Sequence, residues 1–414
     1  MSNVRPKWKV PGLSAQLVCA LPYLSVIAQT LSHFLNTSPT PFAAAFVYPL
    51  LFVVLPVLLT YPIRASAPVL LGLYFSGWNL IVLFFLSPLN SESLFRFTSL
   101  LWQVALMIFV ATALDKDGVS VSKIFLNYGT SCATIVALSN LLYPSLGFSP
   151  AYFAFERYEG LFGPNAHGLT SAIAAMAFIS YASGRSYSKA SRLLFAIIVC
   201  WLLANVWASG SRLSVLTVLA FLVIFSNKRL YRYLIFAILL AGSVVFIMLP
   251  NKETVLLLFR FDEYSFWGRV NPPLWGWQMA RENYFQPYGF TTLREDILEQ
   301  RLDSSFLIFL LEVGWIGTAL LTGIITLTLV RCKFLERHLQ TTEKAIDIRA
   351  IYATLVALCL HGLGENSLFT SSNVATLLFW TIIGAAHANH TSAPPLRHHR
   401  LSGRWGRDAV STSR

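Results

Sequence analysis

The chain has 414 residues, of which 55% are hydrophobic and only 12% are charged, and its mean hydropathy is +0.60. About a quarter of the residues in soluble proteins are charged, so this composition excludes an ordinary soluble domain or a disordered chain and indicates a membrane protein. Lys and Arg outnumber Asp and Glu by 31 to 19, which gives a net charge of +12. In a membrane protein this excess is typical of loops beside an anionic inner leaflet, so we expect no nucleic-acid partner.

Twelve apolar segments are candidate membrane spans, since a crossing helix needs about 20 residues. The first segment follows Arg5, Lys7 and Lys9 but lacks a convincing small-residue cleavage site, which favours an uncleaved first helix over a signal peptide. The sequence therefore predicts an all-α polytopic membrane protein with about 12 transmembrane helices. The predicted spans are 13–35, 42–60, 67–86, 97–114, 124–143, 167–183, 191–207, 213–225, 231–249, 304–330, 350–364 and 374–388.

Lys and Arg are concentrated in every second loop of the predicted topology, as expected when the amino terminus is cytoplasmic. The two termini and the loops predicted on the same side of the membrane as the amino terminus together hold 22 of the 31 Lys and Arg residues. Six of the others lie in one long segment, 250–303. We therefore expect both termini in the cytoplasm of a bacterium and this segment as a large periplasmic loop of an inner-membrane protein. The predicted parts are a basic amino terminus (1–12), helices one to nine (13–249), the periplasmic loop (250–303), helices ten to twelve (304–390) and a disordered basic tail (391–414).

Arg212 and Glu312 are charged residues at the edge of apolar runs or inside them. Burying a charge in a bilayer is costly, so such residues usually line a site or pair with one another. Arg212 follows a Ser-Gly-Ser turn on the predicted outer face, where it is either a binding cation or a helix-end side chain that reaches the interface. Glu312 either lines a cavity or ties two helices together through an arginine or a hydroxyl.

Other polar candidates lie in the predicted outward segments. Asp303 opens the tenth span and is either a helix cap or a general base. Arg269 precedes Trp275 and Trp277, a pattern that favours an amphipathic stretch on the bilayer surface, although these tryptophans are equally typical of plain interfacial anchors. His167 is a second candidate base, and its alternative role is that of a hydrogen-bonded interfacial residue.

Three motifs between residues 157 and 289 combine arginine with turn-forming residues. Residues 157–165 read Arg-Tyr-Glu-Gly-Leu-Phe-Gly-Pro-Asn and lead into a span, and residues 209–212 read Ser-Gly-Ser-Arg before another. In the long segment, Arg269 is followed by Pro287 and Gly289. In this order the motifs resemble those of the O-antigen ligase and O-antigen polymerase (Wzy-type) superfamily of bacterial inner-membrane enzymes.

A fourth motif, residues 303–314, is the most specific part of the resemblance. It is similar to the ligase pattern His-Asn-x-Tyr-Leu followed by Glu-x-Gly, with the same internal spacing. Asp303 stands at the ligase histidine position and Ser304 at the neighbouring asparagine position. This departure favours a polymerase-like member of the superfamily over a ligase.

The resemblance implies glycan transfer on the periplasmic side, from an undecaprenyl diphosphate donor to a sugar hydroxyl of an acceptor. Fixed guanidinium groups stabilise a diphosphate leaving group, so Arg212 and Arg269 are the candidate groups for that role. A carboxylate such as Asp303 suits the removal of the acceptor proton, and attack opposite the leaving group inverts the anomeric centre. The candidate substrate-binding residues are Arg157, Asn165, Glu312 and Arg301.

We expect no cofactor and no metal, because arginines can carry the electrostatic work at the diphosphate. Asp115-Lys116-Asp117 has the Asp-x-Asp spacing of metal-dependent nucleotide-sugar transferases, but it stands in a short predicted loop with no nucleotide-binding domain attached. His361 and Glu365, four residues apart, supply two ligands at most, too few for a metal site. The five cysteines are scattered and imply neither a metal cluster nor a disulfide framework.

The expected partners are an undecaprenyl-diphosphate-linked oligosaccharide, a glycan acceptor and membrane lipids, with a chain-length regulator as a further candidate. Two alternative functions stay open. One is an O-antigen ligase that attaches glycan to lipid A-core, and the other is a polysaccharide transporter or flippase. The short middle connection, 184–190, and the lack of a visible repeat between the two halves argue against a transporter.

Overall fold

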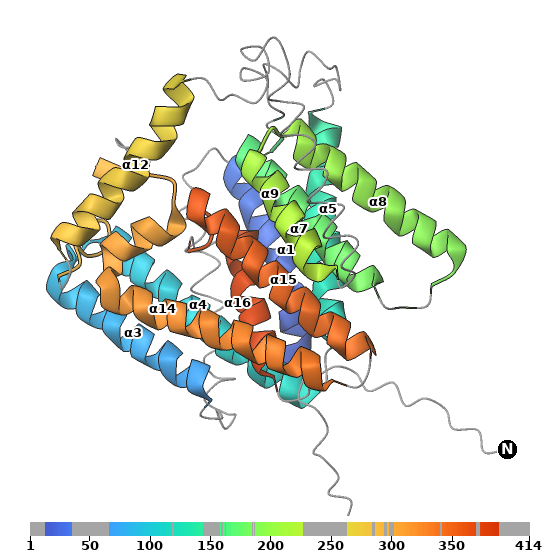
Figure 1. Cartoon of the computed structure of the whole chain (residues 1–414), viewed down its shortest axis with the longest axis horizontal. Helices are drawn as coiled ribbons and strands as arrows, with labels where there is room; N and C mark the ends of the chain where they lie inside the picture. Colours follow the sequence, from blue (N-terminus) through green and yellow to red (C-terminus); the bar gives the residue numbers. More distant parts are fainter. Residues whose placement is uncertain are drawn as a thin grey trace, which may run out of the picture.

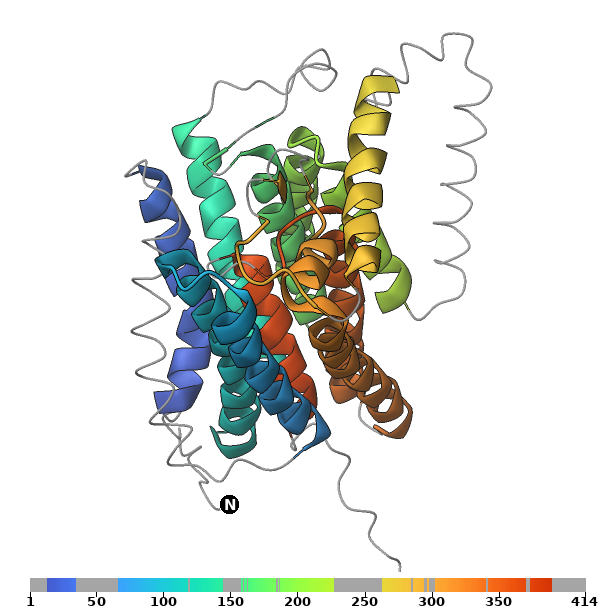
Figure 2. The same cartoon turned by 90° about the vertical axis from the view of Figure 1, so that its left-hand side faces the viewer.

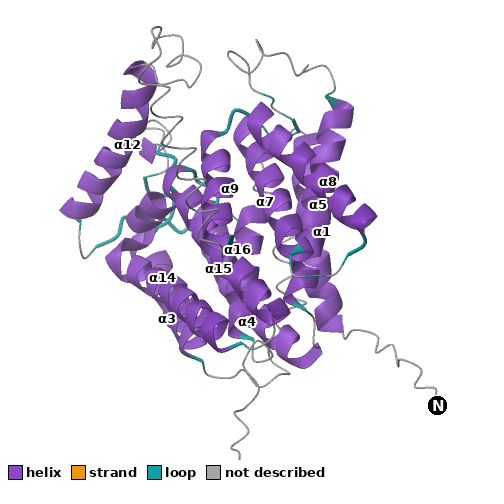
Figure 3. Cartoon of the chain, turned by 45° about the vertical axis from the view of Figure 1, so that its right-hand side comes forward, coloured by secondary structure: helices purple, strands orange, loops and turns teal. Residues whose placement is uncertain are grey.

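The computed structural model describes residues 13–34, 66–117, 120–143, 158, 160–161, 163–183, 185, 187–226, 263–283, 286–293, 296–297, 302–339, 342–369 and 373–388. Every secondary-structure element within these ranges is helical, and no strand occurs among them (Figure 3). The helices pack into one bundle (Figure 1). They are α1 (Leu13–Phe34), α3 (Ala67–Leu86), α4 (Ser91–Asp117), α5 (Val121–Leu142), α7 (Pro164–Ala182), α8 (Lys189–Ala208), α9 (Arg212–Phe225), α12 (Glu263–Glu282), α14 (Ser305–His338), α15 (Thr342–Gly364) and α16 (Val374–His387).

Each predicted span that falls within the described ranges coincides with a helix. Six of these helices, α3, α4, α5, α8, α14 and α15, are long and apolar enough to cross a membrane, which supports a helical membrane-embedded protein. The predicted spans 42–60 and 231–249 lie outside the described residues, so the total of twelve stays a prediction.

Three predicted boundaries differ from the structure by more than five residues: α14 ends at His338 rather than at residue 330, α15 begins at Thr342 rather than at residue 350, and α4 begins at Ser91 rather than at residue 97. The Asn90 side chain accepts a hydrogen bond from the Ser93 backbone N–H at 2.8 Å and so caps the polar first turn. The helix also continues to Asp117, which places Asp115 in a helical end and not in a loop.

Two polar contacts join described connections at opposite ends of the bundle. At one end, Asn165 Nδ2 donates to Glu365 Oε1 at 2.7 Å and so joins the start of α7 to the segment after α15. At the other end, Arg185 Nη2 lies 3.7 Å from Asp347 Oδ1 and joins the connection after α7 to α15. This arrangement agrees with the loop alternation that the charge pattern predicts, while the identity of the periplasmic side stays a prediction.

Helix α16 fills the centre of the bundle. Every residue from Val374 to Ala386 is buried, and the helix packs against α1, α4, α7, α14 and α15. A helix that is apolar all round is buried by its neighbours on every side. Buried polar contacts fix its orientation: Tyr128 Oη lies 3.0 Å from Thr381 Oγ1, and Arg331 Nε donates to the Ala386 carbonyl at 2.8 Å.

Helix α14 is broken at Gly314, whose backbone has φ 70° and ψ −172°. This region of the backbone map is essentially restricted to glycine. The break leaves a first piece from Ser305 to Val313 and a longer second piece that runs beside α3 (Figure 1). Pro287 packs against the break, since a Cβ added at Gly314 would lie 3.1 Å from the Pro287 Cβ.

The carbonyl groups before the break find donors outside the helix. The Tyr288 and Gly289 backbone N–H groups donate to the carbonyls of Leu311 and Glu312 at 3.0 and 3.2 Å. Trp78 Nε1 on α3 donates to the Val313 carbonyl at 2.7 Å. An irregular backbone at membrane depth requires such partners, because an unsatisfied polar group there costs several kcal/mol.

Helix α12 lies within the predicted periplasmic loop and stands beside the bundle (Figure 2). Trp315 Nε1 donates to the Ala280 carbonyl at 3.2 Å, and the Trp277 and Trp315 rings lie 5.6 Å apart between centroids. Leu302 is buried in the same small apolar cluster. The long segment therefore folds back onto α14 and brings its Pro287–Gly289 stretch to the helix break.

We expect Gly314→Ala to destabilise the protein by about 1–3 kcal/mol, because alanine cannot adopt this conformation without strain and its Cβ would press on Pro287. The matched control is Gly77→Ala in the exposed face of α3, where a Cβ meets no atom within 4 Å. That change should be neutral or stabilising by up to about 1 kcal/mol. Thermal unfolding of both purified variants in one detergent measures the difference, and equal melting temperatures would contradict the strain at the break.

Candidate functional site

Arg212 begins α9 directly after a tight turn of small residues. Ser211 caps the helix: its Oγ accepts from the Ser214 N–H at 3.4 Å and lies 2.8 Å from the Ser214 Oγ. Gly210 has a positive φ of 60°, and Ser209 Oγ donates to the Val206 carbonyl. The turn places the half-buried Arg212 at the positive end of the α9 dipole.

The start of α7 packs closely on this turn. A Cβ on Gly168 would lie 2.4 Å from Ser209 Oγ, so only glycine permits the approach. The chain before α7 follows the same path, since the Tyr158 N–H donates to the Ala208 carbonyl at 3.1 Å. The two arginine-containing motifs at residues 157–165 and 209–212 are therefore neighbours in space.

His167 is fully buried beneath this contact. Its Nε2 lies 3.1 Å from Asn205 Oδ1, and its ring packs edge-on against Tyr158 at 4.7 Å between centroids. A Cβ on Gly160 would lie 2.5 Å from His167 Nδ1, so the opposite edge of the ring is covered as well. These contacts correspond to the hydrogen-bonded structural role, and the ring is fully buried.

Glu365 connects the start of α7 to the start of α14. Its carboxylate accepts from Asn165 Nδ2 at 2.7 Å, while its backbone carbonyl accepts from Ser305 Oγ at 2.7 Å. Ser305 Oγ in turn accepts from the N–H groups of Ser367 and Leu368 at 2.9 and 3.2 Å. In the sequence, Glu365 stands out only as one of two ligands, too few for a metal site. No sequence pattern signals its contact with Asn165, because Asn165 lies 200 positions away.

Helix α9 meets the same segment from the other side. The Leu213 side chain covers Gly364, where an added Cβ would lie 3.1 Å from it, and Thr217 Oγ1 lies 3.0 Å from His361 Nδ1. The amino-terminal ends of α7, α9 and α14 therefore gather around Glu365. Three helix starts at one place concentrate partial positive charge.

Asp303 is exposed and stands one position before the cap of α14. Of the two roles expected for it, the helix cap belongs to Ser304, whose Oγ accepts from the Leu307 N–H at 3.4 Å. Asp303 is thus an exposed residue just before the start of α14, and its role as a base stays a prediction.

Glu312 forms an ion pair with Arg96 of α4, and the shorter of its two hydrogen bonds measures 2.7 Å. The two side chains are only 11% and 15% exposed. Arg96 also donates to the Phe369 carbonyl and so holds the segment that carries Glu365. Glu312 therefore ties α14 to α4 through an arginine, one of the two roles expected for it, and it is largely buried.

The remaining predicted site residues lie partly or wholly outside the described part of the chain. Arg157 and Arg301 are not described. Arg269 belongs to α12 by its backbone, and its side chain is not described. Of the seven predicted residues, the structure brings Asn165, Arg212 and Asp303 to the ends of neighbouring helices, and it connects Glu312 to them through Arg96 and Phe369.

We expect Glu312→Ala to lower the free energy of unfolding by about 3 kcal/mol, because it leaves Arg96 as an uncompensated, largely buried charge. The double variant Arg96→Met with Glu312→Leu removes both charges and should recover part of this loss. The measurement is thermal unfolding of purified protein. A double variant less stable than Glu312→Ala would contradict a coupled ion pair.

No model of a known protein family matches this chain, and no curated protein matches it significantly. The resemblance noted in the sequence therefore stays a prediction carried by the four motifs. A function has to be inferred from the side chains that meet at the ends of α7, α9 and α14 and from the membrane setting of the bundle.

Proposed function

We propose that this protein is a membrane-embedded glycosyltransferase that moves a glycan from an undecaprenyl diphosphate donor to a sugar hydroxyl. Within that class, the reaction is the polymerisation of O-antigen or exopolysaccharide repeat units at the periplasmic face of the bacterial inner membrane. The observation that carries the proposal is the convergence of three helix starts with Arg212, Asn165 and Asp303 at one end of the bundle.

An anionic leaving group suits such a place. As the bond between the anomeric carbon and the diphosphate oxygen breaks, negative charge grows on the diphosphate. Free backbone N–H groups at helix starts bind phosphates, and a guanidinium fixed at the same end stabilises the growing charge without reorganising. Arg212 takes this role, with Arg269 as its expected partner from the long segment.

The acceptor side of the reaction requires a base. Asp303 removes the proton of the attacking hydroxyl while the donor is held at the helix starts. Asn165 contacts the substrate from the start of α7 and is oriented by Glu365. Arg157 and Arg301, which flank these residues in sequence, complete the binding set. The chemistry needs no cofactor.

A carboxylate at position 303 favours polymerisation over ligation, since it replaces the histidine of the ligase pattern. Gel and mass-spectrometric profiles of surface glycan and undecaprenyl-linked intermediates distinguish the functions in a deletion strain. Single repeat units in place of long chains support the polymerase. Full-length chains stranded on the lipid carrier indicate the ligase, and an unchanged profile contradicts glycan transfer.

In that strain, complementation with Arg212→Ala or Arg269→Ala should lower glycan synthesis about 10²–10³-fold, the effect of removing one charge-stabilising donor. Asp303→Ala should lower it about 10²–10⁴-fold through loss of the base. The matched controls are Arg281→Ala and Asp296→Ala, exposed residues of the same long segment, which should complement fully. If all three site variants keep full synthesis at normal protein levels, the site is elsewhere.

Glu365 provides a test of orientation within the site. Glu365→Ala removes the acceptor of the Asn165 hydrogen bond and should lower glycan synthesis by about 10–100-fold, as expected for a lost hydrogen bond to a charged group. Glu365→Gln keeps an acceptor oxygen and should retain most of the activity. Glu343→Ala at the exposed start of α15 is the control. Equal loss in the Ala and Gln variants would show that the charge itself is required and that Glu365 does more than orient Asn165.

A further inference from the structure

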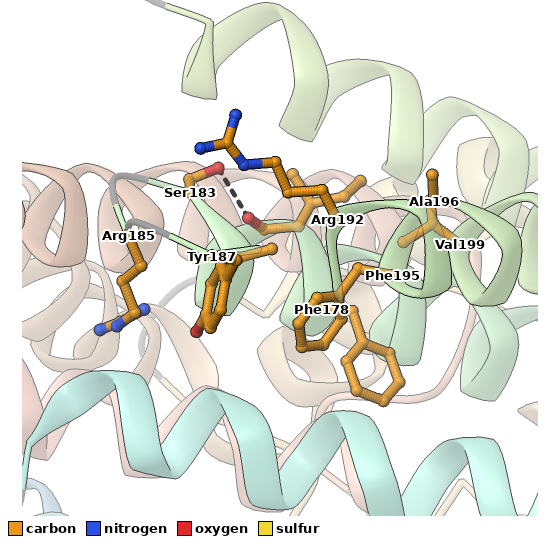
Figure 4. A pocket seen from close by; sticks show the side chains of 10 residues that line it. Phe178, Ser183, Arg185, Tyr187, Arg192, Phe195, Ala196 and Val199 are labelled. Atoms are coloured by element: carbon orange, nitrogen blue, oxygen red, sulfur yellow. Dashed lines mark hydrogen bonds between the residues drawn. The ribbon is translucent and has the colours of Figure 1, made fainter. Parts of the chain in front are cut away.

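A pocket of about 300 Å³ lies between α7 and α8, at the far end of α7 from the candidate site. The 19 residues of α7 separate the two places, a distance of roughly 28 Å at about 1.5 Å per residue. Figure 4 shows the Arg192 and Arg185 side chains reaching outward in different directions, with Tyr187 between them, and the Phe178 and Phe195 rings together on the side away from the Arg192 guanidinium. The lining consists of Phe178, Ile179, Ala182, Ser183, Arg185, Tyr187, Arg192, Phe195, Ala196 and Val199.

The polar side of the pocket carries two cations that differ in their contacts. Arg185 is partly compensated: it lies 3.7 Å from the Asp347 carboxylate and 4.8 Å from the centre of the Tyr181 ring. The guanidinium of Arg192, which is exposed, makes no hydrogen bond or ion pair with any residue in the described ranges. The pocket therefore has an excess of positive charge beside the hydroxyl groups of Ser183 and Tyr187.

The apolar side of the pocket continues into a surface that faces the bilayer. Only 17% of the apolar window of α8 is buried in the bundle. Leu193, Leu194 and Ile197 on this helix are 63%, 58% and 56% exposed. In a membrane-embedded protein such a helix lies against acyl chains. The pocket consequently joins a cationic, hydroxyl-bearing end to the exposed apolar surface of α8.

We propose that this pocket binds an anionic phospholipid. The lipid phosphate contacts Arg192, because Arg185 is already held by the Asp347 carboxylate and the Tyr181 carbonyl. An acyl chain lies along the apolar wall formed by Phe195, Ala196 and Val199. Basic pockets between membrane helices are suited to anionic headgroups, and charge-assisted hydrogen bonds from guanidinium groups to phosphate are among the strongest available. A free anion would use Arg192 but not the apolar wall, which is why the lipid is the better occupant.

Native mass spectrometry of the purified full-length protein, titrated with phosphatidylglycerol or phosphatidylcholine, tests the proposal. The wild type should bind phosphatidylglycerol more tightly than phosphatidylcholine. Arg192→Gln should weaken phosphatidylglycerol binding about fivefold, the contribution of one basic residue near an anionic surface, and leave phosphatidylcholine binding unchanged. Arg337→Gln removes the same charge from the exposed end of α14 and should have no effect.

A second pair of variants tests the apolar wall without changing charge. Ala196→Trp fills the pocket and should weaken phosphatidylglycerol binding at least fivefold, whereas Ala204→Trp, at an exposed position on the same helix, should leave it unchanged. Wild-type affinity in Arg192→Gln or in Ala196→Trp would overturn the proposal. Displacement of the bound lipid by millimolar inorganic phosphate would also overturn it, by indicating a site for free anions.

Discussion

The break of α14 at Gly314 is the constraint on which the candidate site depends. A continuous helix would use the carbonyls of Leu311 and Glu312 internally and would leave no acceptors for the Tyr288 and Gly289 N–H groups. Because the helix is interrupted, the long segment is fixed to the membrane part of the bundle by backbone hydrogen bonds. These bonds do not depend on side-chain identity, whereas the φ angle at residue 314 does.

Around this break the chain assembles one region from segments that are far apart in sequence. The first piece of α14 begins at Ser305, which donates to the Glu365 carbonyl in the segment after α15. Near its end lies Glu312, whose partner Arg96 donates to the Phe369 carbonyl of the same segment. The same segment reaches α7 and α9. Polar contacts of this kind require mutual fit, so each helix end is positioned by its neighbours rather than by its own sequence.

Much of the fold could be predicted because apolar length and charge alternation act locally: each predicted span in the described ranges is a helix. The sequence also identified Arg212 and Asp303 as residues at helix starts. It could not identify Glu365 or Arg96, since their roles come from partners 200 and 216 positions away. Cap choice was also ambiguous, because Asp303 and Ser304 are both good caps and only the backbone geometry selects the serine.

The enclosure of α16 has a consequence for how the protein is made. It is the last helix along the described chain, yet it occupies the middle of the bundle and contacts helices that are synthesised much earlier. The ribosome delivers the amino-terminal segments first, so α1, α4 and α7 enter the bilayer before their common partner exists. Until Val374–His387 is translated, lipid or another helix has to occupy its place, and the bundle can close only as a late, concerted step.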